Sequence, residues 1–189
     1  AFRPLTAVLA VIGGTYELKG VARMHERPIK DLVDALTQIG AKIDYIGNIG
    51  YPPLKISPGS IKCNKNINIK GNISSQYLTA LLIAGPLCNQ DLKIKVIGNL
   101  ISKPYIDITL KLLTQFGIRY KNNEEGNFTL SASSRFKSPK KIKVEGDASS
   151  ASYFFAAGAI AGSVEVSNIN KSSIQGDLEF LKIIKKMGA

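Results

Sequence analysis

An internal repeat is the feature that most constrains how this chain can fold. Residues 71–82 (GNISSQYLTALL) join a polar, glycine-started turn to an apolar helix, and residues 146–157 (GDASSASYFFAA) repeat that pattern. Self-similarity of this kind is typical of stacked copies of one supersecondary unit. The sequence therefore predicts an array of similar units with helices that start at equivalent positions.

A second helix recurs in step with the first. Residues 27–41 (RPIKDLVDALTQIGA) are echoed by residues 104–118 and more loosely by residues 175–189. Each segment reads as an amphipathic helix that ends at a glycine. The alternating residues 41–46 and 118–122 follow the first two copies and predict half-exposed strands.

The two ends of the chain do not match complete units. Residue 1 is Ala, and residues 1–9 match the helix start at residues 74–82 without its preceding turn. The third copy of the amphipathic helix stops at Ala189, where a strand is expected. We therefore expect an internal fragment of a longer protein.

Composition indicates a globular chain without membrane helices. The 189 residues are 44% hydrophobic and 21% charged, which suits a core spread over repeats. The longest apolar runs, residues 5–12, 78–87 and 154–161, are much shorter than the roughly 20 residues that span a bilayer. Cys63 and Cys88 are the only cysteines and His25 is the only histidine, so we expect reduced thiols, a cytoplasmic protein and no metal site.

The charge of the chain favours anionic ligands. Its formal net charge is +11, from 25 basic and 14 acidic residues, and such a field attracts anions. The basic residues are scattered, with short clusters at residues 137–141 and 182–186, and no nucleic-acid-binding signature accompanies them. A small, multiply charged substrate fits this field, and a basic RNA-binding or RNA-end-processing repeat protein is the alternative.

Helix starts supply the local chemistry for such a ligand. Ser74 and Ser75 begin one helix, where unpaired backbone N–H groups and the helix dipole favour a phosphate. The alternative is that Ser74 only caps the helix. Ser102 starts the next helix and Arg27 precedes one in the previous unit, so stacked units could bring these groups to one cleft.

Six segments carry a family resemblance, and they occur in family order over nearly the whole chain. The chain resembles the 5-enolpyruvylshikimate-3-phosphate synthase family, also called 3-phosphoshikimate 1-carboxyvinyltransferase. The segments are residues 2–5 (FRPL), 26–36 (ERPIKDLVDAL), 51–54 (YPPL), 73–82 (ISSQYLTALL), 102–109 (SKPYIDIT) and 144–154 (VEGDASSASYF).

The resemblance implies an α/β (α+β) fold with two lobes, an inside-out α/β barrel. Each lobe contains three β-α-β-α-β-β units with helices inside and sheets outside, and substrates bind between the lobes. Residues 1–145 would be units of the N-terminal lobe, the first of them incomplete. Residues 146–189 would start the first C-terminal unit, so the fold would be truncated at both ends.

The family reaction transfers the enolpyruvyl group of phosphoenolpyruvate to the 5-hydroxyl of shikimate 3-phosphate and releases phosphate. It needs no metal and no organic cofactor. The implied partners are therefore these two small anions, with no nucleic acid and no membrane, and the full-length protein is expected to be a monomer.

The resemblance also implies roles for single residues. Ser74 and Ser75 would hold the shikimate phosphate, and Ser102 would be its third hydroxyl ligand. Gln76 would bridge toward both substrates, and Arg27 would grip phosphoenolpyruvate.

Three further residues match the family with weaker implications. Tyr105 lies in the matching shikimate-side loop, and Arg3 lies near the interlobe hinge. Asp147 matches an aspartate at the cleft, where we expect it to cap a helix or to pair across the lobes. The principal Asp and Lys that act as general acid and base would lie beyond Ala189, so residues 1–189 are expected to contain no catalytic residue and to be inactive alone.

Two other functions remain as alternatives within the same fold. A UDP-sugar enolpyruvyl transferase would use a reactive cysteine loop and would lack the SSQ and SKPY segments, and neither Cys63 nor Cys88 has the surroundings of an activated thiol. A non-catalytic relative that uses the cleft for regulation is the other alternative.

Overall fold

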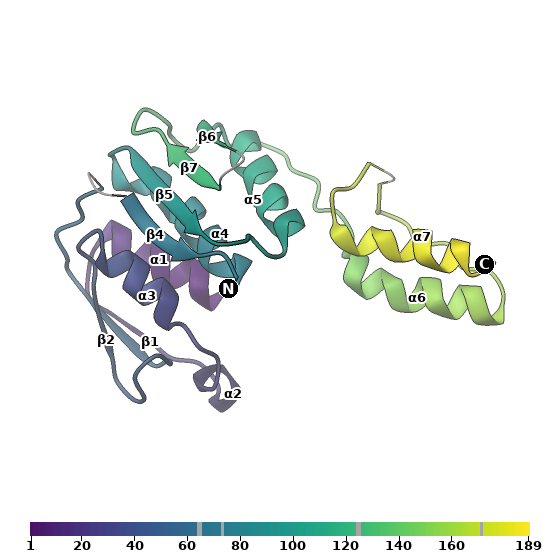
Figure 1. Cartoon of the computed structure of the whole chain (residues 1–189), viewed down its shortest axis with the longest axis horizontal. Coiled ribbons are helices and arrows are strands. Elements are labelled where there is room, and N and C mark those ends of the chain that lie inside the picture. The colour runs from purple at the N-terminus through teal and green to yellow at the C-terminus, as the bar shows by residue number, and fades with distance from the viewer. Residues whose placement is uncertain (64–65, 73, 124–125, 171) are drawn as a thin grey trace. The chain divides into compact units, whose positions relative to one another are not determined.

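The chain forms two compact units, Ala1–Ser138 and Pro139–Ala189, in a computed structural model (Figure 1). The units divide a few residues before the expected crossing near residue 145. Ile73, in the SSQ segment, lies outside the described residues. The structure describes residues 1–63, 66–72, 74–123, 126–170 and 172–189.

Residues 66–130 form one complete β-α-β-α-β-β unit, as expected. Its sheet has the strand order β4-β5-β7-β6, in which β4 and β5 are parallel and the other pairs are antiparallel. The elements are β4 (Asn66–Lys70), α4 (Ser75–Ala84), a 3-10 helix η1 (Gly85–Cys88), β5 (Leu92–Ile97), α5 (Lys103–Gln115), β6 (Tyr120–Asn122) and β7 (Asn127–Leu130).

Residues 2–57 follow the same plan from the first helix of a unit onward. Their sheet has the order β1-β3-β2, with both pairs antiparallel, so β1, β2 and β3 correspond to β5, β6 and β7. Helix α1 then corresponds to α4, and α3 corresponds to α5. The elements are α1 (Phe2–Ile12), β1 (Tyr16–Leu18), α2 (Ala22–His25), α3 (Lys30–Thr37), β2 (Lys42–Tyr45) and β3 (Leu54–Ser57).

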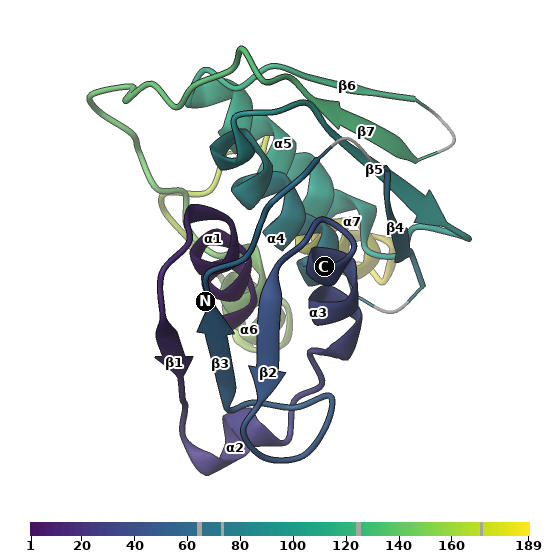
Figure 2. The same cartoon turned by 90° about the vertical axis from the view of Figure 1, so that its left-hand side faces the viewer.

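In the first compact unit, Ala1–Ser138, the helices lie inside and the two sheets lie outside. Helix α1 packs against α4, and α4 packs against α5; α1 and α4 lie between the two sheets (Figure 2). Strand β5 shows why the sheets are peripheral: Leu92, Ile94 and Val96 are buried, while Lys93 and Lys95 between them are exposed. Helix α4 is apolar on nearly all sides. This composition suits a helix that neighbours surround at the centre of the core.

Glycines end the repeated amphipathic helices, as the sequence predicts. Gly40, Gly117 and Gly188 follow α3, α5 and α7 (Glu179–Lys186) with φ angles of 94°, 79° and 101°. Glycine adopts this left-handed conformation at little cost, whereas other residues are strained there.

The second unit contains the helices of the repeat without strands among its described residues. Helix α6 (Ala148–Ala161) packs against α7 and against a 3-10 helix η2 (Gly176–Leu178). Among these described residues, the segments that correspond to β4 and β5 share one backbone hydrogen bond, from Gly146 N to the Asn168 oxygen at 2.7 Å, and form no ladder. Over the described part of both units, every helix is too short or too polar to cross a membrane.

Candidate functional site

The starts of α4 and α5 are adjacent in the structure. The backbone N–H of Ile101, just before α5, donates to the Gly71 carbonyl, just before α4, at 3.2 Å. Further into the two helices, the hydroxyls of Thr79 and Thr109 are 3.1 Å apart. The two helices therefore begin side by side, which brings the segments of Ser74 and Ser102 together.

The predicted hydroxyls differ in what they already bind. Ser74 caps α4, and its Oγ accepts a bond from Gln76 N at 3.3 Å. The hydroxyls of Ser75 and Ser102 have no hydrogen-bond partner within the described part of the chain. Ser75 is 8% exposed, and Ser102 is exposed with a left-handed φ of 56°. Tyr105, 54% exposed, lies in the first turn of α5.

A close approach explains the glycine that begins each repeated turn. A Cβ on Gly71 would lie 2.6 Å from Val96 Cγ1 and 2.8 Å from the Asn99 carbonyl oxygen. At Gly146 the equivalent contacts are 3.0 Å to Ile169 Cγ1 and 3.1 Å to the Asn168 oxygen. Both turns thus pass close against a neighbouring segment, with a bond from Gly71 N to the Ile97 oxygen at 3.0 Å that matches the one from Gly146.

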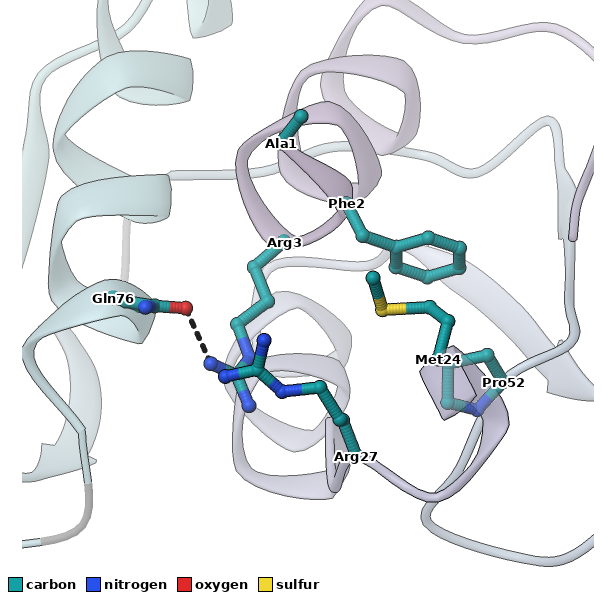
Figure 3. A pocket seen from close by; sticks show the side chains of 7 residues that line it. All are labelled: Ala1, Phe2, Arg3, Met24, Arg27, Pro52 and Gln76. Atoms are coloured by element: carbon teal, nitrogen blue, oxygen red, sulfur yellow. Dashed lines mark hydrogen bonds between the residues drawn. The ribbon is translucent and has the colours of Figure 1, made fainter. Parts of the chain in front are cut away.

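Arg3, from α1, organises the polar groups at the start of α4. Its Nη1 donates to Gln76 Oε1 (Figure 3). Its Nη2 donates to the Pro28 carbonyl at 2.9 Å. The guanidinium also lies 4.8 Å from the centroid of the Tyr77 ring. Because the Gln76 oxygen accepts from Arg3, the amide nitrogen of Gln76 is the end left to donate to a ligand.

Arg27 lies in the same small pocket. Figure 3 shows Arg27 reaching toward Arg3 and Gln76, with the apolar side chains on the opposite side. Among the described residues no acidic group pairs with Arg3 or Arg27, so the pocket presents two cations and one amide, the equipment for a carboxylate or phosphate. Its lining consists of Ala1, Phe2, Arg3, Met24, Arg27, Pro52 and Gln76.

Two tyrosines with raised pKa values were not singled out by the sequence. Burial raises the pKa of Tyr77 above its ordinary value, while the Arg3 charge opposes the shift. Burial, with the charges of Asp34 and Asp31, raises the pKa of Tyr45 to about 12. The Tyr45 hydroxyl is buried without a hydrogen-bond partner in the described part of the structure.

Asp147 belongs to the second unit and caps α6. Its carboxylate accepts bonds from the backbone N–H groups of Ser149 and Ser150, each at 3.2 Å, and from the Ser150 hydroxyl. These bonds, led by the Ser150 hydroxyl, lower the pKa of Asp147. The capping role expected for Asp147 is therefore present in the structure.

The two cysteines, far apart in sequence, are neighbours in the core. Cys63 and Cys88 are free and buried, and their thiols are close enough to perturb each other's ionisation. That contact lowers the pKa of Cys63, and the same contact together with burial raises the pKa of Cys88. No cluster of three or more His, Cys, Asp or Glu side chains within the described ranges could hold a metal ion.

The structure therefore brings most of the predicted site residues to one side of the first unit. Arg3, Arg27 and Gln76 share the pocket, next to the start of α4. Sequence reasoning did not select Phe2, Met24, Pro52 or Tyr77. Phe2, Pro52 and Tyr77 lie inside the FRPL, YPPL and SSQY segments, so those segments held the signal, whereas Met24 stood in no segment.

Comparison with known proteins identifies one family over the entire chain. The model of the family "EPSP synthase (3-phosphoshikimate 1-carboxyvinyltransferase)" matches residues 1–189. A 3-phosphoshikimate 1-carboxyvinyltransferase from Janthinobacterium sp. (strain Marseille) is 57% identical over 192 residues, covering 100% of this chain and 43% of the relative. One from Cupriavidus necator is 54% identical, covering 100% of this chain and 44% of the relative. The chain thus spans less than half the length of these relatives.

A solved structure supports the fold. The EPSP synthase from Acinetobacter baumannii superposes with a TM-score of 0.75 at 22% identity, and the match covers 99% of this chain and 40% of that one. The α/β architecture implied by the family resemblance is therefore confirmed.

Proposed function

The chain belongs to the EPSP synthase (3-phosphoshikimate 1-carboxyvinyltransferase) family, and on this premise we propose that it forms part of an enzyme that makes enolpyruvylshikimate phosphate. In the proposed reaction the 5-hydroxyl oxygen of shikimate 3-phosphate attacks C2 of phosphoenolpyruvate while C3 gains a proton. Loss of phosphate and of a C3 proton from the tetrahedral adduct then restores the alkene.

One observation supports this function above the others. Arg27 and Gln76 come from different units of the repeat and line one pocket beside the Ser74 cap. The Arg27 guanidinium has no partner among the described residues and so remains available to an anion. A site for two anionic substrates requires such free cationic and hydroxyl groups side by side.

We assign the roles of the binding residues on that basis. Ser74, Ser75 and Ser102 hold the phosphate of shikimate 3-phosphate at the adjacent helix starts, where backbone N–H groups and helix dipoles add to the hydroxyls. Tyr105 contacts the same substrate. Gln76 bridges the two substrates through its amide nitrogen.

On the phosphoenolpyruvate side, Arg27 binds the substrate and Arg3 holds Gln76 in place for it. The general acid and base that protonate C3 and accept the hydroxyl proton come, in this proposal, from outside residues 1–189. The first unit and the second unit are assigned to the N-terminal and C-terminal lobes, and the full-length protein is proposed to be a cytoplasmic monomer.

Calorimetry and an activity assay on the full-length protein containing this chain test the proposal. Phosphate release should require both substrates. Replacing Ser74 and Ser75 together by Ala should weaken shikimate 3-phosphate binding by about 100-fold, the scale of two charge-assisted hydrogen bonds. A matched Ser131→Ala/Ser133→Ala variant removes a serine pair in the loop after β7, with hydroxyls 2.9 Å apart, and should leave binding unchanged.

Absence of phosphate release from the wild-type protein would refute the enzymatic assignment. Steep salt dependence of RNA binding, unaffected by shikimate 3-phosphate, would instead support the RNA-binding alternative.

A further inference from the structure

The Pro28 carbonyl oxygen accepts two hydrogen bonds from the interior of the first unit. The Tyr77 hydroxyl donates to it at 2.8 Å, and Arg3 Nη2 donates at 2.9 Å. A carbonyl oxygen has two lone pairs, so these donors use its full accepting capacity. Pro28 follows Arg27 directly in the chain, and its carbonyl is therefore an anchor for the backbone that carries Arg27.

The segment around Arg27 is held at three consecutive residues. Arg27 N donates to the Met24 oxygen at 3.2 Å, and Ile29 N donates to the Gly50 oxygen at 2.9 Å. Ile29 is 1% exposed and anchors the segment in the core. Pro28 lacks an N–H and restricts the conformation of the residue before it. The backbone of Arg27 is thus fixed while its guanidinium stays free of partners in the described structure.

Tyr77 is well placed to transmit rigidity from the core to this segment. Its ring is 1% exposed and belongs to α4, and its hydroxyl reaches out of the core to Pro28. Tyr77 follows Gln76 in the chain. One turn of α4 therefore carries both the Gln76 amide that is proposed to bind the substrates and the hydroxyl that contacts the Arg27 segment. Arg3 connects Gln76 to the Arg27 segment, because its guanidinium donates to both Gln76 and Pro28. The same guanidinium lies over the Tyr77 ring.

We propose that Tyr77 is a positioning residue for phosphoenolpyruvate: its hydroxyl, with Arg3, holds the Pro28 carbonyl and thereby sets the position from which Arg27 binds the substrate. This inference rests on the proposed function. Tyr77 acts through Arg27 and does not touch the substrate. Ordering an arginine when the substrate binds lowers the binding affinity. A backbone that is already ordered reduces this cost.

The Tyr77→Phe variant distinguishes the contribution of the hydroxyl from that of the ring. Phenylalanine keeps the apolar ring in the core and under Arg3, and it removes only the bond to Pro28. One neutral hydrogen bond is worth about 1 kcal/mol, which corresponds to about a five-fold change. In the full-length enzyme we expect KM for phosphoenolpyruvate to rise about five-fold, with kcat and KM for shikimate 3-phosphate changed less than about two-fold.

The matched control is Tyr16→Phe. The Tyr16 hydroxyl donates to the Gly13 carbonyl at 2.9 Å, the same kind of bond at the other end of α1. Measured by denaturant titration, Tyr16→Phe should lower the free energy of unfolding about as much as Tyr77→Phe does. It should leave KM for phosphoenolpyruvate unchanged. Equal effects of Tyr16→Phe and Tyr77→Phe on KM would overturn the inference, because stability alone would then account for both.

A double-mutant cycle with Arg27→Ala tests whether Tyr77 acts through Arg27. If it does, adding Tyr77→Phe to Arg27→Ala should not raise KM for phosphoenolpyruvate further, because the group that Tyr77 positions is already gone. Additive effects would overturn the inference while leaving the proposed function intact. A wild-type protein without enolpyruvyl transfer would refute the proposed function itself, so the two failures are distinguishable.

Discussion

The guanidinium of Arg3 lies 4.8 Å from the ring centroid of Tyr77, and the two residues occupy the first turns of α1 and α4, the equivalent helices of successive repeat units. The contact therefore joins the units where their helices begin. It combines a cation–π interaction with the bonds from Arg3 to Gln76 and Pro28.

Replacing Arg3 by Lys should destabilise the chain although the charge is kept. An ammonium group cannot lie flat over Tyr77 and donate to Gln76 and Pro28 in the fork geometry of a guanidinium. We expect a loss of about 1–2 kcal/mol in the free energy of unfolding, measured by denaturant titration. Arg23→Lys is the control, since the Arg23–Glu26 ion pair is exposed and should cost less than about 0.5 kcal/mol.

Changing Ser74 to Asp should separate helix capping from phosphate binding. Aspartate is as good an N-cap as serine, so α4 should keep its stability. Its negative charge would repel the phosphate of shikimate 3-phosphate, and we expect calorimetric binding to weaken by at least about 100-fold. Unchanged affinity in this variant would mean that Ser74 is only a cap.

Gly71→Ala should be more damaging than Gly146→Ala. The new Cβ at residue 71 would lie 2.8 Å from a backbone oxygen, that of Asn99, so the main chain would have to move. We expect a loss of about 1–3 kcal/mol in unfolding free energy. At residue 146 the nearest atoms are 3.0 Å or more away, so the loss should be smaller. Thermal and denaturant melts of both variants provide the comparison, and the reverse ranking would contradict it.

Tyr45→Phe should protect the chain against alkali. The pKa of Tyr45 is raised from 10.0 to about 12, so the folded state holds its proton more tightly than the unfolded state. The resulting contribution of Tyr45 to the free energy of unfolding is fully present below pH 10 and is lost as the pH rises toward 12. Unfolding free energy should therefore fall less steeply over this range in Tyr45→Phe than in the wild type. Parallel curves would contradict the prediction.

The start of α6 should weaken in acid through Asp147. Its folded-state pKa lies below the ordinary 3.8, so the stabilisation is fully present above that pH and is lost as the pH falls through the lowered value. The amide NMR signals of Ser149 and Ser150 should titrate in this range. In Asp147→Asn, which keeps a capping side chain but cannot ionise, these two signals should not follow that titration.

Local patterns explain why much of the fold could be predicted. The periods of the helices, the alternation in residues 41–46 and 118–122 and the glycine after α3 and α5 are properties of short segments, and the helices, the strands β2 and β6 and the glycines appear where the sequence predicts them. Ser74 and Ser102 could be predicted as helix-start residues for the same reason, since the start of a helix is marked by a few neighbouring residues.

The second unit shows where such reasoning stops. A strand needs a partner for its backbone hydrogen bonds, and in the described residues of this unit the neighbouring segments exchange only one, from Gly146 to Asn168. The sequence of residues 146–189 therefore reads as a repeat, while its described structure contains only the helices.

By itself the sequence determined the repeat, the order of its elements and the residue types at the helix starts, because these depend on interactions within a few residues. The tertiary structure alone decided that Arg3 would meet Gln76, Tyr77 and Pro28, that Cys63 would lie beside Cys88, and that the Tyr45 hydroxyl would be buried without a partner among the described residues. These contacts depend on how α1, α3 and α4 pack together, and that packing is set by the whole core.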